Sequence, residues 1–207
     1  MLLANNIDFK RNNKTILKNV SLSLPPKKII HLTGKNGAGK TTLLKILTNI
    51  LEPEFGEVFW NSKNIKKNSF EFYKNTTFIM DQQTSDSALT VEENIFFWCK
   101  LFCSKLNSRE INSILNLLIL GEYKNIIVNN LSYGEKKKLE LSRLIIEQKK
   151  LWILDEPYIG LDNASIDLIN QTIENHVALG GMIIFTSHIK PELNNMEKLN
   201  LENNAYF

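Results

Sequence analysis

The stretch Gly34-Lys35-Asn36-Gly37-Ala38-Gly39-Lys40-Thr41-Thr42 decides the fold of this chain. Residues 34–41 match the pattern G-x-x-x-x-G-K-[ST], whose small residues let backbone N–H groups face an anion. A β-branched run at 28–33 precedes the loop and an amphipathic run at 40–50 follows it, so the loop joins a strand to a helix. We therefore predict a phosphate-binding loop in which Lys40 reaches the β- and γ-phosphates and Thr41 places its hydroxyl on Mg²⁺.

Strand-like and helix-like runs alternate on both sides of this loop. We expect strands at 2–9, 19–24, 28–33, 57–60, 77–80, 150–154 and 182–186. We expect helices at 40–50, 92–106, 108–120, from about 134, and at 163–179. Ser108 is the predicted N-cap of its helix, and Gly180-Gly181 closes the last one. This order predicts an α/β protein with a parallel sheet and a helical subdomain.

Two acidic residues follow the apolar run 151–154, at the carboxyl end of a predicted strand, where ligands bind in parallel sheets. Asp155 suits a role linked to Mg²⁺, directly or through water. Glu156 suits a general base that polarises the attacking water. Taken alone, the pair is typical of a helix start. Together with residues 34–41, it favours a nucleotide-hydrolysing site.

Three smaller features have both a structural and a functional interpretation. Ser132 and Glu135 form a capping box at the start of a charged helix, and the same helix end is a candidate phosphate site. His188 follows the last predicted strand on the ligand-facing side, although a lone histidine is more often structural. Gln82 follows another strand and begins the passage to the helical region, where a solvated loop residue is the simpler interpretation.

In this order the motifs resemble those of the ATP-binding cassette (ABC) ATPases, and the resemblance covers nearly the whole chain. The Walker A loop is then 34–41, the Q-loop Gln82, the signature 131–135, the Walker B strand with its glutamate 151–156, the D-loop 160–162 and the switch histidine His188. A P-loop GTPase would need an Asn-Lys-x-Asp motif, and none occurs in the sequence.

The resemblance implies an ATPase with ATP and Mg²⁺ bound at one site. The nucleotide-binding residues are implied to be Gly34, Lys35, Asn36, Gly37, Ala38, Gly39, Lys40, Thr41 and Thr42. The implied catalytic residues are Lys40, Gln82, Glu156 and His188, and the implied Mg²⁺ ligands are Thr41, Gln82 and Asp155. The residue that stacks on adenine falls at Phe9 or Arg11, and the sequence does not choose between them.

The resemblance also implies that ATP closes a head-to-tail dimer of two copies and that hydrolysis reopens it. Ser132, Tyr133, Gly134 and Glu135 would contact the nucleotide held by the opposite subunit, and Asp162 would communicate between the two sites. This arrangement supplies charge stabilisation in the transition state without an arginine finger. Tyr133 stands where the family often has glycine, which is tolerable if its side chain points away from the phosphate.

For the fold, the resemblance implies one nucleotide-binding domain over 1–207. Its P-loop NTPase core has a mixed, mainly parallel sheet and an N-terminal antiparallel β subdomain. The core with the β subdomain is expected at 1–83 and 149–207, and the helical signature subdomain at 84–148. Gln82 and the loop 84–89 are expected to act as the hinge that carries motion to a membrane partner.

Several local details resemble one subfamily, the ATPase subunits of the haem exporters of cytochrome c maturation. The details are the stretches 36–44, 56–60, 89–95, 151–157 and 180–184. The subfamily role implies membrane subunits as partners and the conveyance of haem, or the release of a haem-loaded chaperone. An ABC transporter ATPase with another cargo is the main alternative. A non-transport ABC ATPase fits less well, because the DNA type needs a long heptad insertion and the ribosome type two cassettes.

Composition bounds the remaining questions. The 25 basic and 22 acidic residues of this 207-residue chain give a net charge of +3, which by itself indicates neither nucleic acid nor a membrane surface as a partner. No run approaches the length of a membrane span and no presequence is evident. The 22 Lys, 26 Asn and 24 Ile have A/T-rich codons. We expect a protein on the cytoplasmic face of a bacterial inner membrane, or on the matrix side of the mitochondrial inner membrane if organelle-encoded.

Overall fold

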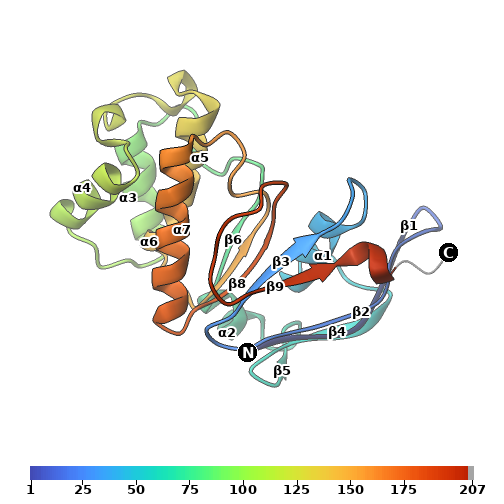
Figure 1. Cartoon of the computed structure of the whole chain (residues 1–207). Coiled ribbons are helices and arrows are strands. Elements are labelled where there is room, and N and C mark those ends of the chain that lie inside the picture. Colours follow the sequence, from blue (N-terminus) through green and yellow to red (C-terminus); the bar gives the residue numbers. More distant parts are fainter. Residues whose placement is uncertain (205–207) are drawn as a thin grey trace.

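Two β-sheets and a group of helices make up the molecule, and the computed structural model describes residues 1–204 (Figure 1). An antiparallel sheet has the order β2-β1-β4-β5, with β1 at Leu2–Arg11, β2 at Lys14–Leu24, β4 at Phe55–Trp60 and β5 at Lys63–Asn64. A parallel sheet has the order β6-β7-β8-β3-β9, with β6 at Thr76–Ile79, β7 at Leu151–Leu154, β8 at Met182–Thr186, β3 at Ile29–Thr33 and β9 at Met196–Asn200. The predicted fold class is confirmed, with the two strand directions kept in separate sheets.

Seven α-helices are assigned within residues 1–204: α1 at Lys40–Leu47, α2 at Ser69–Lys74, α3 at Val91–Leu101, α4 at Ser108–Leu117, α5 at Tyr133–Leu141, α6 at Arg143–Ile146 and α7 at Asn163–Ala178. Short 3₁₀ helices lie at Gly121–Tyr123, Val128–Asn130 and Leu201–Asn204. In Figure 1, α3 to α6 form a helical group at one end, and α7 stands beside the parallel sheet. No helix within 1–204 is both long and apolar enough to cross a membrane.

The central strands β7 and β8 of the parallel sheet are buried on both faces, so they are largely apolar runs. Side chains alternate between two cores because successive residues of a strand point to opposite faces. On β7, Trp152 and Leu154 face the core that includes the helical group, and Leu151 and Ile153 face the core that includes α1. The apolar face of α1 is thereby held between the two sheets, at the point where the phosphate loop enters it.

Three helices of the helical group, α3, α4 and α5, begin at side chains that accept hydrogen bonds from their free N–H groups. Thr90, Asn107 and Ser132 each form a capping box with the glutamate three residues later. The prediction that Ser108 caps α4 is wrong by one position. Asn107 has extended backbone angles and accepts the N–H groups of Arg109 and Glu110, which makes Ser108 the first helical residue.

Three elements were absent from the sequence prediction: β5, α2 and β9. Each is short, and each lies in a polar, lysine- and asparagine-rich stretch without clear periodicity. The sheet edge explains β9, because its backbone pairs with β3 while its side chains stay partly exposed. The glycine closure of α7 is confirmed: Gly180 has φ 99° and donates its N–H to the Val177 carbonyl.

One titratable residue near the end of helix α7, His176, makes the stability of the protein depend on pH. The imidazole of His176 stacks on Trp152 with ring centroids 3.7 Å apart, and its Nε2 lies 3.2 Å from the Lys150 carbonyl. Burial lowers the pKa of His176 from 6.5 to about 4. The unfolded chain therefore binds the proton more readily than the folded chain between these two values, and stability falls as pH falls through that window.

We predict that the free energy of unfolding decreases by on the order of 1 kcal/mol between pH 7 and pH 5 on account of this residue. Thermal denaturation followed by circular dichroism at the two pH values measures the change. The variant His176→Phe keeps a ring against Trp152 but does not titrate, so its midpoint should depend less on pH. Equal pH dependence in both proteins would contradict the assignment.

Candidate nucleotide site

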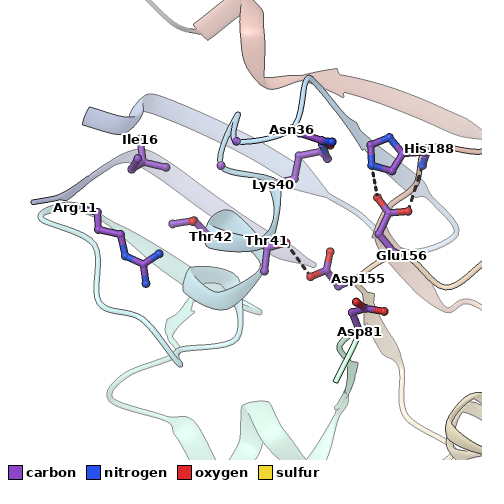
Figure 2. Close-up of a pocket in the computed structure, with 12 residues that line it drawn as sticks. Arg11, Ile16, Asn36, Lys40, Thr41, Thr42, Asp81, Asp155, Glu156 and His188 are labelled. Atoms are coloured by element: carbon purple, nitrogen blue, oxygen red, sulfur yellow. Dashed lines mark hydrogen bonds and ion pairs between the residues drawn. The ribbon is translucent and has the colours of Figure 1, made fainter. Parts of the chain in front are cut away.

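A polar pocket of about 510 Å³ opens at the carboxyl ends of β3 and β7 (Figure 2). It brings together residues from β1, β2, the phosphate loop, α1 and the ends of three parallel strands. The lining residues are Arg11, Ile16, Asn36, Gly37, Gly39, Lys40, Thr41, Thr42, Asp81, Asp155, Glu156 and His188. The sequence motifs that predict a phosphate site thus meet in one place, as expected for ligands at the strand ends of a parallel sheet.

The phosphate loop has the backbone that its sequence predicts. Gly37 and Gly39 have φ of 85° and 94°, values that L-residues with a side chain rarely adopt. A Cβ at Gly39 would also lie 2.8 Å from Leu17, so the loop packs tightly on β2. The Lys40 ammonium donates to the carbonyls of Gly34 (2.7 Å) and Lys35 (3.2 Å), which holds the lysine side chain along the loop.

Asp155 is the most buried charge of the pocket, with 6% of its surface exposed. Its two carboxylate oxygens accept hydroxyls from two different elements: Thr41 on α1 at 2.8 Å and Thr186 on β8 at 2.6 Å. A hydroxyl and a carboxylate side by side are oxygen donors of the kind that Mg²⁺ prefers. Thr41 and Asp155 therefore fit the cation that the resemblance implies.

Glu156 has a backbone φ of 48°, unusual for a residue with a side chain. Its N–H donates to the Thr186 hydroxyl at 2.9 Å. Its carboxylate accepts the backbone N–H of His188 at 3.2 Å and lies 3.4 Å from His188 Nε2 (Figure 2). The predicted base and the predicted switch histidine are therefore neighbours across the end of the sheet.

Other predicted residues are distributed more widely. Arg11 lines the pocket, while Phe9 packs against the core around α1. Gln82 is exposed and does not line the pocket, whereas Asp81 does. Asp162 caps α7 by accepting the Ser165 N–H at 2.8 Å, and hydrogen bonding from Ser165 lowers the pKa of Asp162.

The signature residues lie outside the pocket, at the N-terminus of α5. Ser132 caps the helix, and Gly134 lies so close to the Gly160 carbonyl that a Cβ would approach it to 2.5 Å. The Tyr133 hydroxyl donates to Asp81 at 2.9 Å, which turns this side chain toward its own subunit's pocket edge.

Two supporting residues were missed by sequence reasoning. Thr186 is the last residue of the predicted strand 182–186, and its hydroxyl donates to Asp155 and accepts the Glu156 N–H. Glu202 accepts the N–H of Lys35 at 2.6 Å, so the C-terminal 3₁₀ helix supports the phosphate loop. Neither has a local sequence signal, because each partner lies far away along the chain.

Comparison with known proteins shows the family to which the chain belongs. The sequence pattern of the ABC transporter family matches residues 17–159. The chain belongs to this family. It is 34% identical over 188 residues to the cytochrome c biogenesis ATP-binding export protein CcmA of Yersinia pestis, covering 91% of this chain and 86% of that protein. It is 34% identical over 194 residues to CcmA of Legionella pneumophila, covering 94% and 96%.

Solved structures confirm the ABC ATPase fold. A putative ABC transporter ATP-binding protein from Pyrococcus furiosus superimposes with a TM-score of 0.85 at 22% identity, covering 99% of both chains. A dimeric ATP-binding cassette bound to ADP and phosphate, in a post-hydrolysis state, gives a TM-score of 0.77 at 21% identity, covering 91% of this chain and 88% of that one. The chain is an ABC-type ATPase, and the pocket is where its phosphate-binding motif meets its acidic residues.

A substitution at Thr186 tests the pocket without changing a residue that lines it. We predict that Thr186→Val lowers kcat for ATP hydrolysis by about tenfold, because Asp155 and the Glu156 N–H each lose a buried partner. Thr186→Ser keeps the hydroxyl and should retain most of the activity. Steady-state phosphate release by the purified variants measures the effect. Wild-type turnover in Thr186→Val would show that this hydroxyl does not position the carboxylates.

Proposed function

We propose that this ATPase is the energy-supplying subunit of a cytochrome c biogenesis export complex, which conveys haem or releases a haem-loaded chaperone. The observation that carries the proposal is the 34% identity to CcmA proteins over 91–94% of the chain. The proposed partners are the transmembrane subunits of the same complex. The proposed location is the cytoplasmic face of a bacterial inner membrane or the matrix side of the mitochondrial inner membrane.

In the proposed reaction, the triphosphate of ATP lies along residues 34–42, with Lys40 toward the β- and γ-phosphates. Mg²⁺, held by Thr41 and Asp155 with Gln82 as the third ligand that the family resemblance implies, would offset the phosphate charge. Glu156 polarises the attacking water as general base, and His188 holds the γ-phosphate. The contact between Glu156 and His188 supports this pairing, since both groups must face the same phosphate. Arg11 is the proposed partner of the adenine ring, because it lines the pocket and Phe9 does not.

A single pocket leaves the γ-phosphate open to solvent on one side. We propose that a second copy of the chain closes it with the α5 N-terminus, through Ser132, Tyr133, Gly134 and Glu135, while Asp162 links the two sites. The capped but outward-facing start of α5 supports this, because helix N-termini attract anions. The helical subdomain, residues 84–148, would carry the closing motion to the membrane subunits.

We predict that Glu156→Gln, which removes the base and keeps a side chain of the same size, traps the ATP-bound dimer. Light scattering or gel filtration of the variant with Mg²⁺ and ATP, beside its membrane partners if required, should give twice the mass seen with ADP. Lys40→Ala is the matched control, because without the phosphate-binding ammonium the dimer should not form. A Glu156→Gln variant that stays monomeric under all these conditions refutes the composite site.

The identity of the cargo has to be tested in cells, because the isolated chain shows only ATP hydrolysis. We predict that the protein co-purifies with cytochrome c maturation membrane subunits, and that Lys40→Ala abolishes c-type cytochromes without abolishing that association. Haem staining of separated membrane proteins measures the cytochromes. Normal c-type cytochromes in the Lys40→Ala strain would assign the ATPase to another cargo and leave its catalytic role standing.

A further inference from the structure

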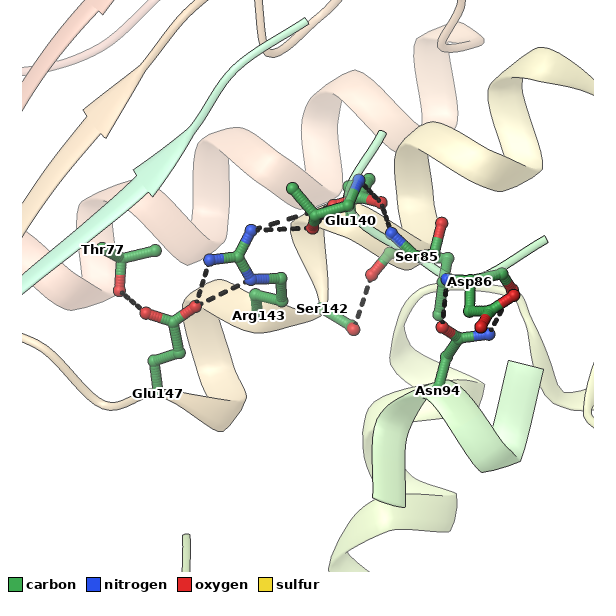
Figure 3. Close-up of polar contacts among 10 residues, drawn as sticks. Thr77, Ser85, Asp86, Asn94, Glu140, Ser142, Arg143 and Glu147 are labelled. Carbon is green, nitrogen blue, oxygen red and sulfur yellow. Dashed lines mark hydrogen bonds and ion pairs between the residues drawn. The ribbon is translucent and has the colours of Figure 1, made fainter. Parts of the chain in front are cut away.

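The segment after β6 is fastened to the signature helix α5 by one buried carboxylate (Figure 3). Glu140 has only 3% of its side chain exposed. Its Oε1 accepts the backbone N–H groups of Thr84 (2.8 Å) and Ser85 (2.7 Å), and its Oε2 accepts the Thr84 hydroxyl at 2.6 Å. These three hydrogen bonds hold the segment strongly, because a hydrogen bond to an ionised group is stronger than one between two neutral groups.

Arg143 extends this attachment toward the sheet. Its guanidinium donates to the Thr84 hydroxyl at 3.1 Å and to Glu147 through Nε at 2.8 Å. The second oxygen of Glu147 accepts the hydroxyl of Thr77 on β6, also at 2.8 Å. Figure 3 shows the chain of contacts from Thr77 to Glu140, with Arg143 between the two carboxylates. Buried charges must be paired in this way, so the arrangement has little freedom to shift.

Asp81, at the end of this segment that lies in the nucleotide pocket, contacts the same face of α5 as Thr84 does. Asp81 lines the nucleotide pocket, accepts the Tyr133 hydroxyl at 2.9 Å and lies 3.8 Å from the ammonium of Lys137, whose side chain is only 4% exposed. Tyr133, Lys137 and Glu140 are spaced four and three residues apart, which places them in one row along α5. Gln82 therefore stands between two attachment points, Asp81 and Thr84.

The following residues are also tied to the helical group. Asn94 of α3 accepts the Asp86 N–H at 2.7 Å and donates to its carbonyl at 3.0 Å. The carbonyls of Ser87 and Leu89 accept the N–H groups of Asn129 and Val128. Residues 84–89 are thus a bonded part of the helical group, which argues against the expectation that they form its hinge. The last backbone hydrogen bond between this segment and the neighbouring strand joins the Ile79 carbonyl to the Asp155 N–H, so the segment leaves the parallel sheet at Met80.

We propose that Glu140, Arg143 and Thr84 position Gln82 for the ATPase reaction by locking its segment to the signature helix. Gln82 and the α5 N-terminus are then held in a fixed relation to each other, so a displacement of one is passed to the other. The inference rests on the proposed roles of Gln82 and of the signature residues. It assigns Glu140, Arg143 and Thr84 as positioning residues, which do not touch ATP.

Thr84 gives the cleanest test, because a substitution there removes two side-chain bonds and leaves the buried ion pair intact. We predict that Thr84→Val lowers kcat for ATP hydrolysis by about tenfold, with KM for ATP unchanged, and that Thr84→Ser restores kcat. Thr172→Val is the matched control. It removes a threonine hydroxyl that is bonded at 2.9 Å to the Leu168 carbonyl within its own helix α7, and it should leave kcat unchanged.

A double-mutant cycle separates positioning from a general loss of stability. If Thr84 acts through Gln82, then Thr84→Val has no further effect on kcat in the Gln82→Ala background. A further tenfold loss in that background overturns the inference, as does wild-type kcat in Thr84→Val while Gln82→Ala is impaired. Wild-type kcat in Gln82→Ala overturns the inference together with the proposed role of Gln82. The variant Glu140→Gln, which keeps an acceptor but loses the charge, should show a smaller fall in kcat and the same dependence on Gln82.

Discussion

The buried carboxylate of Asp155 is the interaction on which the arrangement of the pocket depends. A charge with 6% of its surface exposed must have hydrogen-bond partners, because an unpaired buried charge costs several kcal/mol. Here the partners are hydroxyls on α1 and β8, so one side chain of β7 joins the phosphate loop's helix to the end of a neighbouring strand. The charge that would attract Mg²⁺ is therefore also the link that aligns the parts of the site.

At the end of the same strand, Glu156, the residue proposed to act on water, has a left-handed backbone conformation. Left-handed backbone at a residue with a side chain costs roughly 1–2 kcal/mol, and it persists only where surrounding contacts impose it. At Glu156 those contacts are the Thr186 hydroxyl on its N–H and the His188 N–H on its carboxylate. The turn directs the Glu156 side chain into the pocket, where a regular continuation of β7 would alternate it away.

The helical group is joined to the rest of the molecule by paired charges as well as by apolar contacts. Its apolar interior continues into one face of the parallel sheet, and a row of charges, Glu140, Arg143 and Glu147, crosses the same junction. Apolar contacts permit sliding at small cost, whereas paired charges with hydrogen bonds tolerate few alternative positions. In the proposed dimer, a helical group that presents the start of α5 to the second copy would gain from such a junction. The segment from Asp81 to Asp86 links the nucleotide pocket to the signature helix α5, because Asp81 and Thr84 are both hydrogen-bonded to that helix.

Much of this protein could be predicted from local pattern. Residues 34–42 predict the phosphate loop, since glycine spacing and a following apolar periodicity are properties of a short stretch of chain. The runs 151–154 and 182–186 predict buried parallel strands, and Asp155 and Glu156 follow from their place at a strand end. The cap of α4 was misplaced because asparagine and serine both cap well, and backbone direction decides between them.

What only the tertiary structure decided concerns residues whose partners lie far away along the chain. Nothing near Thr186, Glu202 or Glu140 in the sequence indicates that these residues support the strand-end carboxylates, the phosphate loop and the segment of Gln82. The choice of Arg11 over Phe9 at the pocket likewise depends on irregular pairing between β1 and β2, which changes the face that each residue presents. The sequence by itself determined the family and the chemical groups of the site, because short motifs carry them. The fold decided how those groups are held, because hydrogen bonds between distant segments exist only once the chain has brought them together.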